Sequence, residues 1–489
     1  MKRKYFIQLC CLIAITVSLD TCREKEESDW PAHIPGQPIK LSNFDPLEGG
    51  RATQLMIRAE NLGNDPKILE VYFGDRKAPV IGCNMGKALV VVPRLPSTGE
   101  YDVIVKIGDN QVTYSEKFSY TVRAVVSTVC GNPNSGNISF REGPFETAVL
   151  RQPSYLTCDI YGNIFGAHRS DQGAASSQFA GVFMVNEEEQ YVRSLTTVKG
   201  QPTMPTTDVT GRIIIVPENG GGDSNTRGDY YWEFDPEADW AAKERSVFHP
   251  TPEEIMSGVK TDFVLNTLKQ SMAICPLDGK IYYRSNKDGV LIRFDSRTRE
   301  GEWARTLEEV EMGLIEDEEG NIQTVYGHQP MYFFKGYDGD SFLVFDPDNP
   351  HMVYASYRAS NNSDHIIIWL NILTGEEGIF AGQRGVDFRG WRDGPVEAAK
   401  FNMPRQMVLD MDGNLLIAEE GNHCIRKIDM KTRMVSTLVG IAGKRGYQDG
   451  NPDDALFDVP WGVCIDRRGE GTVYISDFGN RCIRKLTIE

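Results

Sequence analysis

The chain has 489 residues, of which 40% are hydrophobic and 25% charged, and its formal net charge is -17 at pH 7. This length exceeds one ordinary domain, so we expect at least two compact units. The negative charge argues against a nucleic-acid-binding surface, which needs excess Lys and Arg. The 47 Gly and 25 Pro indicate many turns. Because long helical periodicity is hard to find, the composition favours an all-β protein.

The first 22 residues have the pattern of an export signal. Basic residues at positions 2–4 precede an apolar stretch at 5–19, which is too short to span a bilayer comfortably and predicts a signal peptide. The following "LDTC" resembles a bacterial lipobox, in which the Cys is lipidated, although Asp20 and Thr21 stand where small residues are usual. We expect lipidation of Cys22. The alternative is cleavage and secretion with Cys22 unmodified.

Residues 23–37 are polar and contain Pro, so we expect a tether. The tether begins with the acidic run "REKEESD", which resembles the surface-export signal of Bacteroidetes lipoproteins. This resemblance implies a protein that is lipid-anchored in the outer membrane and exposed at the cell surface.

Seven of the ten Cys lie beyond the signal and lipobox, which contain Cys10, Cys11 and Cys22. An odd number without a CxxC pair argues against both a disulfide framework and a zinc site. Several of the seven stand in apolar, strand-like runs, so we expect them to pack as small buried hydrophobes.

Residues 38–123 consist of short runs with period-two alternation, separated by turn signals. This pattern predicts a small β-sandwich. The runs "FDPLEGG" (44–50), "IRAENLG" (57–63) and "VYFGD" (71–75) resemble an IPT/TIG immunoglobulin-like domain. The resemblance implies a spacer or partner-contact module, and we find no chemistry in the segment.

A twelve-residue pattern recurs beyond residue 123. "EGPFETAVLRQP" (142–153), "DGPVEAAKFNMP" (393–404) and "DGNPDDALFDVP" (449–460) share an acid, a Gly, an Ala, an apolar residue and a final Pro, and an Asp follows each at position seventeen. A period near fifty residues indicates a propeller or solenoid. Residues repeated around a ring face every direction, so we expect them to be structural. Phe140, Trp391 and Tyr447 share one such repeated slot, and we expect packing between blades.

The last repeat ends after its third strand, and "AVVSTVCG" (124–131) resembles the fourth strand that it lacks. We therefore predict that an N-terminal strand closes the propeller and removes its open edge. Six second strands can be counted, which predicts a six-bladed propeller over residues 124–489. The runs "DMDGNLLIAEEGNHCIRKID" (410–429) and "DFGNRCIRKL" (477–486) resemble NHL repeats.

In a propeller of this topology, the loops from fourth to first strand and from second to third strand share one face, which is the default ligand site. Trp461 stands alone among non-aromatic equivalents, one of which is Arg405, at the start of an inner strand. It is either a sugar-stacking platform or a plug in the channel. The remaining candidates begin the second-to-third loops and are His168, Arg169, Glu218, Asn219, Tyr357, Arg358, Glu419, Glu420, Asp477 and Phe478.

Enzymatic motifs are missing from the sequence. The seven His form no HExxH or close pair, and neither a GxSxG elbow nor a P-loop is present. His168 and His423, with the neighbouring carboxylates Glu419, Glu420 and Asp477, could hold a divalent cation. We favour a mixed surface ring with no metal and no cofactor. A carboxylate pair for glycoside hydrolysis leaves no local signature and stays open.

The resemblances together suggest a Bacteroidetes-like surface lipoprotein with a lipid anchor, a tether, an IPT/TIG spacer and an NHL-type propeller. They imply a role in outer-membrane systems that capture glycans for import through TonB-dependent transporters. We expect glycan binding without catalysis. The alternatives are a propeller hydrolase or lyase acting on a glycan or small molecule, and a protein-interaction scaffold.

Overall fold

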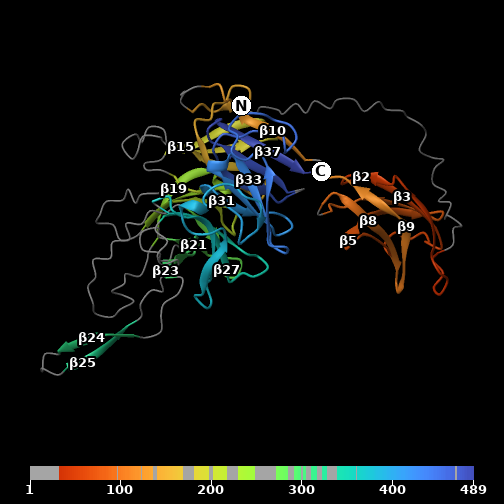
Figure 1. Cartoon of the computed structure of the whole chain (residues 1–489), viewed down its shortest axis with the longest axis horizontal. Coiled ribbons are helices and arrows are strands. Elements are labelled where there is room, and N and C mark those ends of the chain that lie inside the picture. The colour runs from red at the N-terminus through yellow and green to blue at the C-terminus, as the bar shows by residue number, and fades with distance from the viewer. Residues whose placement is uncertain are drawn as a thin grey trace, which may run out of the picture. The chain divides into compact units, whose positions relative to one another are not determined.

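The computed structural model contains two compact units, which divide between residues 123 and 124 (Figure 1). Regular structure in the described residues is strand apart from three short 3-10 turns, η1 (Pro236–Ala238), η2 (Val386–Phe388) and η3 (Glu420–Asn422). The predicted all-β class is confirmed. The described residues are 32–95, 97–122, 124–135, 140–168, 181–197, 202–216, 229–247, 271–284, 291–298, 301–303, 310–316, 322–327, 339–359, 361–468 and 471–488.

Unit 1 is a β-sandwich. Its strands are β1 (Lys40–Asp45), β2 (Glu48–Gly49), β3 (Gln54–Glu60), β4 (Leu69–Phe73), β5 (Arg76–Ala78), β6 (Val80–Asn84), β7 (Lys87–Val91), β8 (Gly99–Ile107) and β9 (Asn110–Tyr120). They form two sheets with the orders β1-β3-β7-β6 and β2-β9-β8-β4-β5. Alternate residues of β3 and β8, such as Ile57 and Val105, are buried in one shared core. The period-two pattern thus turns one face of each sheet inward.

Unit 2 consists of successive antiparallel sheets. The first half of its strands are β10 (Ala124–Gly131), β11 (Gly143–Pro144), β12 (Pro153–Cys158), β13 (Ile164–His168), β14 (Gly181–Asn186), β15 (Tyr191–Thr197), β16 (Thr206–Thr207), β17 (Ile213–Ile215), β18 (Asp229–Asp235), β19 (Ala241–Val247), β20 (Met272–Ile274), β21 (Ile281–Arg284), β22 (Leu291–Phe294) and β23 (Gly301–Trp303).

The second half are β24 (Val310–Glu316), β25 (Ile322–Gly327), β26 (Gly339–Phe345), β27 (Met352–Ala359), β28 (His365–Asn371), β29 (Glu377–Ala381), β30 (Gly394–Pro395), β31 (Pro404–Leu409), β32 (Leu415–Glu419), β33 (Cys424–Asp429), β34 (Met434–Val439), β35 (Pro460–Asp466), β36 (Thr472–Asp477) and β37 (Cys482–Ile488). Strands β24 and β25 form a separate two-stranded sheet, which the sequence pattern did not indicate.

The remaining sheets of unit 2 are arranged around a ring. Inner strand β12 neighbours β16 and β35, and the ring continues through β20, β26 and β31 back to β35. The propeller fold is thereby confirmed. The count of six blades stays a prediction, because several segments between residues 198 and 338 lie outside the described residues.

The ring closes where the chain enters and leaves it. Strand β10 pairs with β37 in the sheet β10-β37-β36-β35, from Ala124 opposite Ile488 to Gly131 opposite Cys482. Figure 1 shows the orange β10 beside the blue β37. Val126 of β10 is buried with Phe457 and Leu486. The predicted closure by an N-terminal strand is confirmed, and it satisfies a sheet edge that would otherwise be open.

In three blades, the repeated acid of the twelve-residue pattern holds the fourth strand by a hydrogen bond. Asp393 Oδ2 accepts the Thr437 N–H at 3.0 Å, and Asp449 Oδ2 accepts the Thr128 N–H at 3.1 Å. Glu142 accepts the N–H of Ser194 in the same way, at 2.9 Å. The repeated residues therefore have structural roles.

Other repeated positions support this conclusion. The Asp after the inner strand caps a hairpin turn, since Asp410 Oδ1 accepts the Asn414 N–H at 2.8 Å. Gly413 supplies the positive φ of 80° that this turn requires. In the shared aromatic slot, Trp391 and Tyr447 remain about half exposed and hydrogen-bond to the hydroxyls of the fourth-strand residues Thr437 and Thr128.

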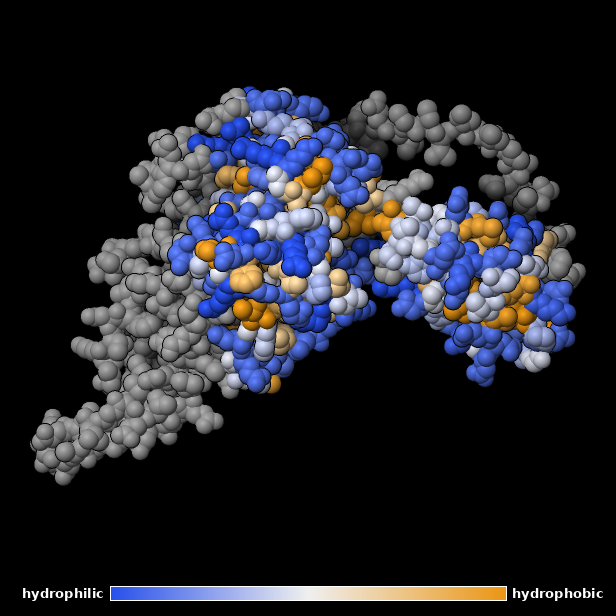
Figure 2. Space-filling model, viewed as in Figure 1, coloured by the Kyte–Doolittle hydropathy of each residue, from blue (hydrophilic) through white to orange (hydrophobic). Residues whose placement is uncertain are grey.

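In Figure 2 the visible face is largely hydrophilic with scattered apolar residues. Within the described ranges, no helix has the length and apolar character needed to cross a bilayer.

Adjacent residues of β10 allow a matched test of the closure. We expect Val126→Asp to lower the free energy of unfolding by about 3 kcal/mol or more, because Val126 is 1% exposed and the new carboxylate would be buried without a partner. Val125 is 51% exposed, so Val125→Asp should change it by only about 0.5 kcal/mol. Urea unfolding of both variants measures the difference, and equal effects would contradict the closure.

Candidate functional site

One face of the ring receives the ends of the second strands and the starts of the inner strands. Pro404 of β31 lies opposite Glu419 of β32, and Pro460 of β35 lies opposite Asp477 of β36. The longest connections, from β19 to β20 and from β23 to β26, also join strands at this face, whereas β12 joins β13 at the other face through a short turn. The first of these faces is the one that the sequence analysis predicts.

Four of the predicted residues meet at the centre of this face and form the mouth cluster: Arg405, Glu420, Trp461 and Phe478. The Trp461 ring is stacked on Phe478, with centroids 4.0 Å apart and planes inclined by 15°. The Arg405 guanidinium carbon lies 4.3 Å from the centroid of the Trp461 ring. Arg405 Nε donates to Glu420 Oε2 at 2.5 Å.

The mouth cluster is preorganised. Arg405 is 6% exposed, and it is fixed by a carboxylate and by an indole ring. A partly desolvated cation–π contact contributes about 1–2 kcal/mol, and the charge-assisted hydrogen bond adds direction. Trp461 and Phe478 remain partly exposed. The cluster thus offers planar surfaces and charged groups whose positions are set before any ligand arrives.

Trp461 also closes the channel. Its ring is stacked at 5.8 Å on Tyr155, which packs on Phe342 at a centroid distance of 4.7 Å. Tyr155, Phe342 and Met204 are buried and form an apolar layer beneath Trp461. Both alternatives for Trp461 therefore have a geometric basis: it fills the channel, and its partly exposed ring belongs to the mouth surface.

Two predicted site residues, Glu419 and Asp477, face the interior of their own blades. Arg426 donates to Glu419 Oε2 at 2.8 Å and to Asp393 Oδ1 at 2.6 Å. Arg484 donates to Asp477 Oδ2 at 2.8 Å and to Asp449 Oδ1 at 2.6 Å. Glu419, Asp477 and both arginines are fully buried. Burial raises the pKa of both carboxyls, and the arginines oppose that rise.

These ion pairs belong to the repeat rather than to the mouth cluster. Each Arg joins the end of the second strand to the repeated acid, so it locks the blade internally. The sequence contained a signal for this role, because both carboxylates are followed by the same "CIRK" run with its Arg seven residues on. We therefore leave Glu419 and Asp477 out of the binding surface that we propose.

His168 takes the position of these carboxylates in the blade of β12 to β15. It lies opposite Pro153, and Phe183 stands where β33 and β37 have Arg426 and Arg484. The ring centroids of Phe140 and Phe183 each lie 4.6 Å from that of His168, edge-on. Both ring nitrogens are buried without a hydrogen-bond partner among the described residues. Burial, assisted by the charge of Arg151, lowers the pKa of His168 to about 3, so the imidazole is neutral.

Of the remaining predicted residues, the structure describes Tyr357 and Arg358. Tyr357 is buried in a core that includes Tyr282 and Ile366, while Arg358 next to it is half-buried. Arg169, Glu218, Asn219 and Cys22 lie outside the described residues.

The suggested cation ligands do not converge. His423 Nδ1 accepts the N–H of Val459 at 3.0 Å, whereas Glu419 and Asp477 face their arginines. Within the described ranges, no group of three or more His, Cys, Asp or Glu is placed to hold a metal ion.

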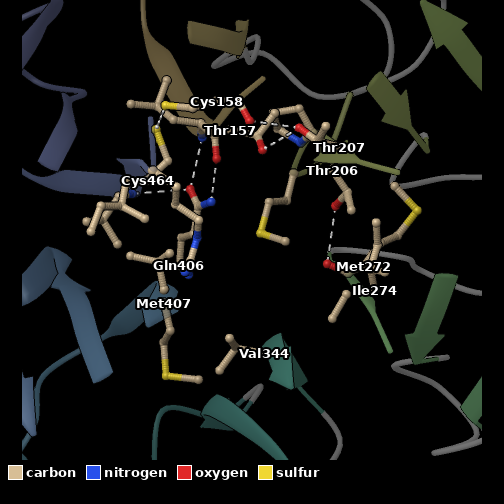
Figure 3. Close-up of a pocket in the computed structure, with 18 of the residues that line it drawn as sticks. Thr157, Cys158, Thr206, Thr207, Met272, Ile274, Val344, Gln406, Met407 and Cys464 are labelled. Carbon is tan, nitrogen blue, oxygen red and sulfur yellow. Dashed lines mark hydrogen bonds between the residues drawn. The ribbon is translucent and has the colours of Figure 1, made fainter. Parts of the chain in front are cut away.

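A cavity of about 530 Å³, which the sequence did not reveal, lies on the other side of the apolar layer. Tyr155 and Phe342 directly precede lining residues on their strands, so the layer separates the cavity from the mouth cluster. Gln406 spans one wall of the cavity: its side chain accepts the Leu156 N–H at 2.9 Å and donates to the Leu156 carbonyl at 2.6 Å (Figure 3). The lining includes residues of the inner strands β12, β16, β20, β26, β31 and β35.

Comparison with known proteins supports the two-part architecture. The family model of the IPT/TIG domain matches residues 40–120, which confirms the identity of the sandwich domain. NHL repeat-containing protein 2 of Homo sapiens is 32% identical over 98 residues, which is 20% of this chain and 13% of that protein. The match spans a small part of that relative. It agrees with the resemblance of the propeller segment to NHL repeats.

Two solved structures share the fold over nearly the whole chain. A protein of unknown function from Bacteroides thetaiotaomicron has a TM-score of 0.71 at 21% identity, over 94% of this chain and all of that chain. An auxiliary nutrient binding protein from Bacteroides ovatus has a TM-score of 0.56 at 20% identity, with the same coverage. At these identities the likeness shows the fold.

The neutral state of His168 predicts acid sensitivity. Its folded pKa, about 3, lies below its ordinary value of 6.5, so the unfolded chain binds the proton first as the pH falls. Lowering the pH from about 7.5 to about 5 should therefore reduce the free energy of unfolding by about 2 kcal/mol through this residue. His168→Phe should abolish that loss.

Urea unfolding at the two pH values measures the effect. His168→Gln, which is also uncharged but lacks the aromatic ring, controls for lost packing: it should lower stability at both pH values and show the same weaker pH dependence. An unchanged dependence in both variants would contradict a neutral buried His168.

Proposed function

We propose that this protein is a cell-surface lipoprotein that binds glycans through the mouth cluster and delivers them for nutrient uptake. The observation that carries the proposal is the meeting of Trp461, Phe478, Arg405 and Glu420 at the centre of the face where the inner strands begin. The name of the Bacteroides ovatus structure, an auxiliary nutrient binding protein, supports a binding role in nutrient acquisition.

The chemistry of the mouth cluster suits a sugar. The C–H face of a pyranose packs on an aromatic ring, and its hydroxyls need charged or polar partners in fixed positions. Trp461 and Phe478 offer the aromatic surface, and the Arg405–Glu420 pair lies beside it. Because the apolar layer closes the channel below, the ligand is held at the surface rather than inside the ring.

We further propose that the remaining parts of the chain hold this face outside the cell. In our proposal residues 1–22 direct export, lipidated Cys22 anchors the chain in the outer membrane, residues 23–37 form a tether, and the IPT/TIG domain is a spacer. An outer-membrane nutrient transporter is the partner that would receive the glycan.

Trp461→Ala should weaken glycan binding at least tenfold, because it removes the ring that joins Phe478 to Arg405. A glycan-array screen of the purified chain identifies a bound polysaccharide, and affinity gel electrophoresis with that polysaccharide measures the loss. Arg405→Lys keeps the charge but loses the planar stack, so we expect a smaller loss of a few-fold.

Trp391→Ala is the matched control, since Trp391 is 51% exposed but occupies the repeated slot and bonds to Thr437. It should leave binding unchanged. Binding that survives Trp461→Ala in a folded protein contradicts the mouth assignment, and an array without any bound glycan contradicts the glycan function. Release of reducing sugar or of an unsaturated product would favour the hydrolase or lyase alternative.

Cys22→Ser tests the anchor separately. In a Bacteroidetes host, the wild-type chain should incorporate a labelled fatty acid and be degraded by protease added to intact cells. The Cys22→Ser chain should lose the label and leave the outer-membrane fraction, because the acyl chains provide the attachment. A label that persists in the variant would exclude Cys22 as the lipidated residue.

A further inference from the structure

The cavity brings together two cysteines from opposite ends of the propeller. Cys158 ends β12, and Cys464 lies in β35, the neighbouring inner strand of the last sheet. Their Sγ atoms are 3.2 Å apart, although 306 positions separate the residues in the chain (Figure 3). A disulfide bond is about 2 Å long, so the sulfurs need to approach by only about 1 Å.

The backbone holds both cysteines in place. Gln406 bonds to the N–H and the carbonyl of Leu156, two residues before Cys158, and also accepts the N–H of Val463, next to Cys464, at 3.3 Å. At Gly462 a Cβ atom would lie 2.5 Å from the Ser154 carbonyl oxygen, so the two strands approach closely because glycine stands there. The sulfur contact therefore lies between two fixed strands rather than in a loop.

Cys158 is also reachable from the cavity. Both cysteines line the cavity of about 530 Å³, and Cys158 is half-buried. Cys464 is buried, as are the other propeller cysteines Cys130, Cys275, Cys424 and Cys482. A small disulfide that enters the cavity would meet Cys158 first and would find Cys464 in contact with it.

We propose that Cys158 and Cys464 are the site of an intramolecular disulfide that joins the first and last blades at the inner edge of the ring. The oxidant is a disulfide R–S–S–R of a small thiol or of a thiol oxidase. The hydrogen bond with Cys464 and burial raise the pKa of the Cys158 thiol, so a small thiolate fraction reacts. This Cys158 thiolate attacks one sulfur of R–S–S–R, forms a mixed disulfide and releases the first R–SH. Cys464 then attacks the Cys158 sulfur and releases the second. Two protein thiols are oxidised, and one R–S–S–R is reduced to two R–SH that carry both protons.

The bond would add a second closure to the ring. Strands β10 and β37 join the two ends by hydrogen bonds, and the disulfide would join them covalently across a loop of more than 300 residues. A cross-link of this span stabilises mainly by restricting the unfolded chain. That the bond forms in the cell rests on the proposed export, because disulfides persist in oxidising compartments.

Oxidised glutathione provides the probe. We expect the full chain, after incubation with it and blocking of free thiols, to give one cross-linked proteolytic peptide pair containing Cys158 and Cys464. Reduction should lower its Tm by about 5 °C. Cys158→Ser and Cys464→Ser should each remove the peptide pair and the Tm shift. Cys275→Ser, which alters a buried cysteine just after inner strand β20, should retain both.

Full alkylation of both cysteines in folded wild-type chain after this incubation overturns the proposal, as does accumulation of the mixed glutathione disulfide alone. This measurement needs no variant, so it stands even if a serine variant fails to fold. Chain isolated from cells under acid quenching tests the compartment separately. If the glutathione experiment gives the disulfide but the protein from cells has free thiols, the disulfide site is supported. The same result contradicts the proposed surface location.

Discussion

The pairing of β10 with β37 is the constraint on which the rest of the propeller depends. It joins residues 124–131 to residues 482–488, so the inner strands can form a ring only when both ends of this unit are in place. The contacts at the centre of the ring form only when the ring is closed. Trp461 of the last sheet stacks on Tyr155 of the first, and Gln406 reaches the backbone of Leu156. The proposed binding surface is made of such distant segments, so it exists only in the closed ring.

Within the ring, three blades differ in the buried residue that ends the second strand, which is Glu419, Asp477 or His168. Arg426 and Arg484 each join a buried carboxylate to the repeated acid, and removing either partner would leave an uncompensated buried charge. The blade of β12 to β15 has no such pair and instead encloses a neutral His168 between Phe140 and Phe183. Two ways of filling the same position thus coexist in one ring. The first uses a buried ion pair, and the second uses an uncharged imidazole between two aromatic rings.

The sequence predicted what repetition and local pattern can encode. The "DG…A…P" repeat and the match between residues 124–131 and 434–440 correctly placed the blade seams and the closing strand, because a strand carries its pairing preference in its own residues. Contacts between inner strands are set by the ring as a whole. Nothing local indicated that Phe478 and Arg405 would both pack on Trp461, or that Cys158 and Cys464 would touch across 306 positions. The repeated "CIRK" run could have indicated that Glu419 and Asp477 are buried ion-pair partners. Their position at the start of a loop led instead to the prediction that they are exposed.

The apolar layer of Tyr155, Met204 and Phe342 divides the axis of the propeller into two compartments that open on opposite faces. A polymer cannot thread through such a ring, so a long glycan would lie across the mouth cluster and continue in both directions. Recognition would then act on internal stretches of a chain as readily as on its ends. A small molecule in the cavity would not compete with that polymer, because the two approach from opposite sides. One fold would therefore keep a large external ligand and a small chemical reagent apart without any moving part.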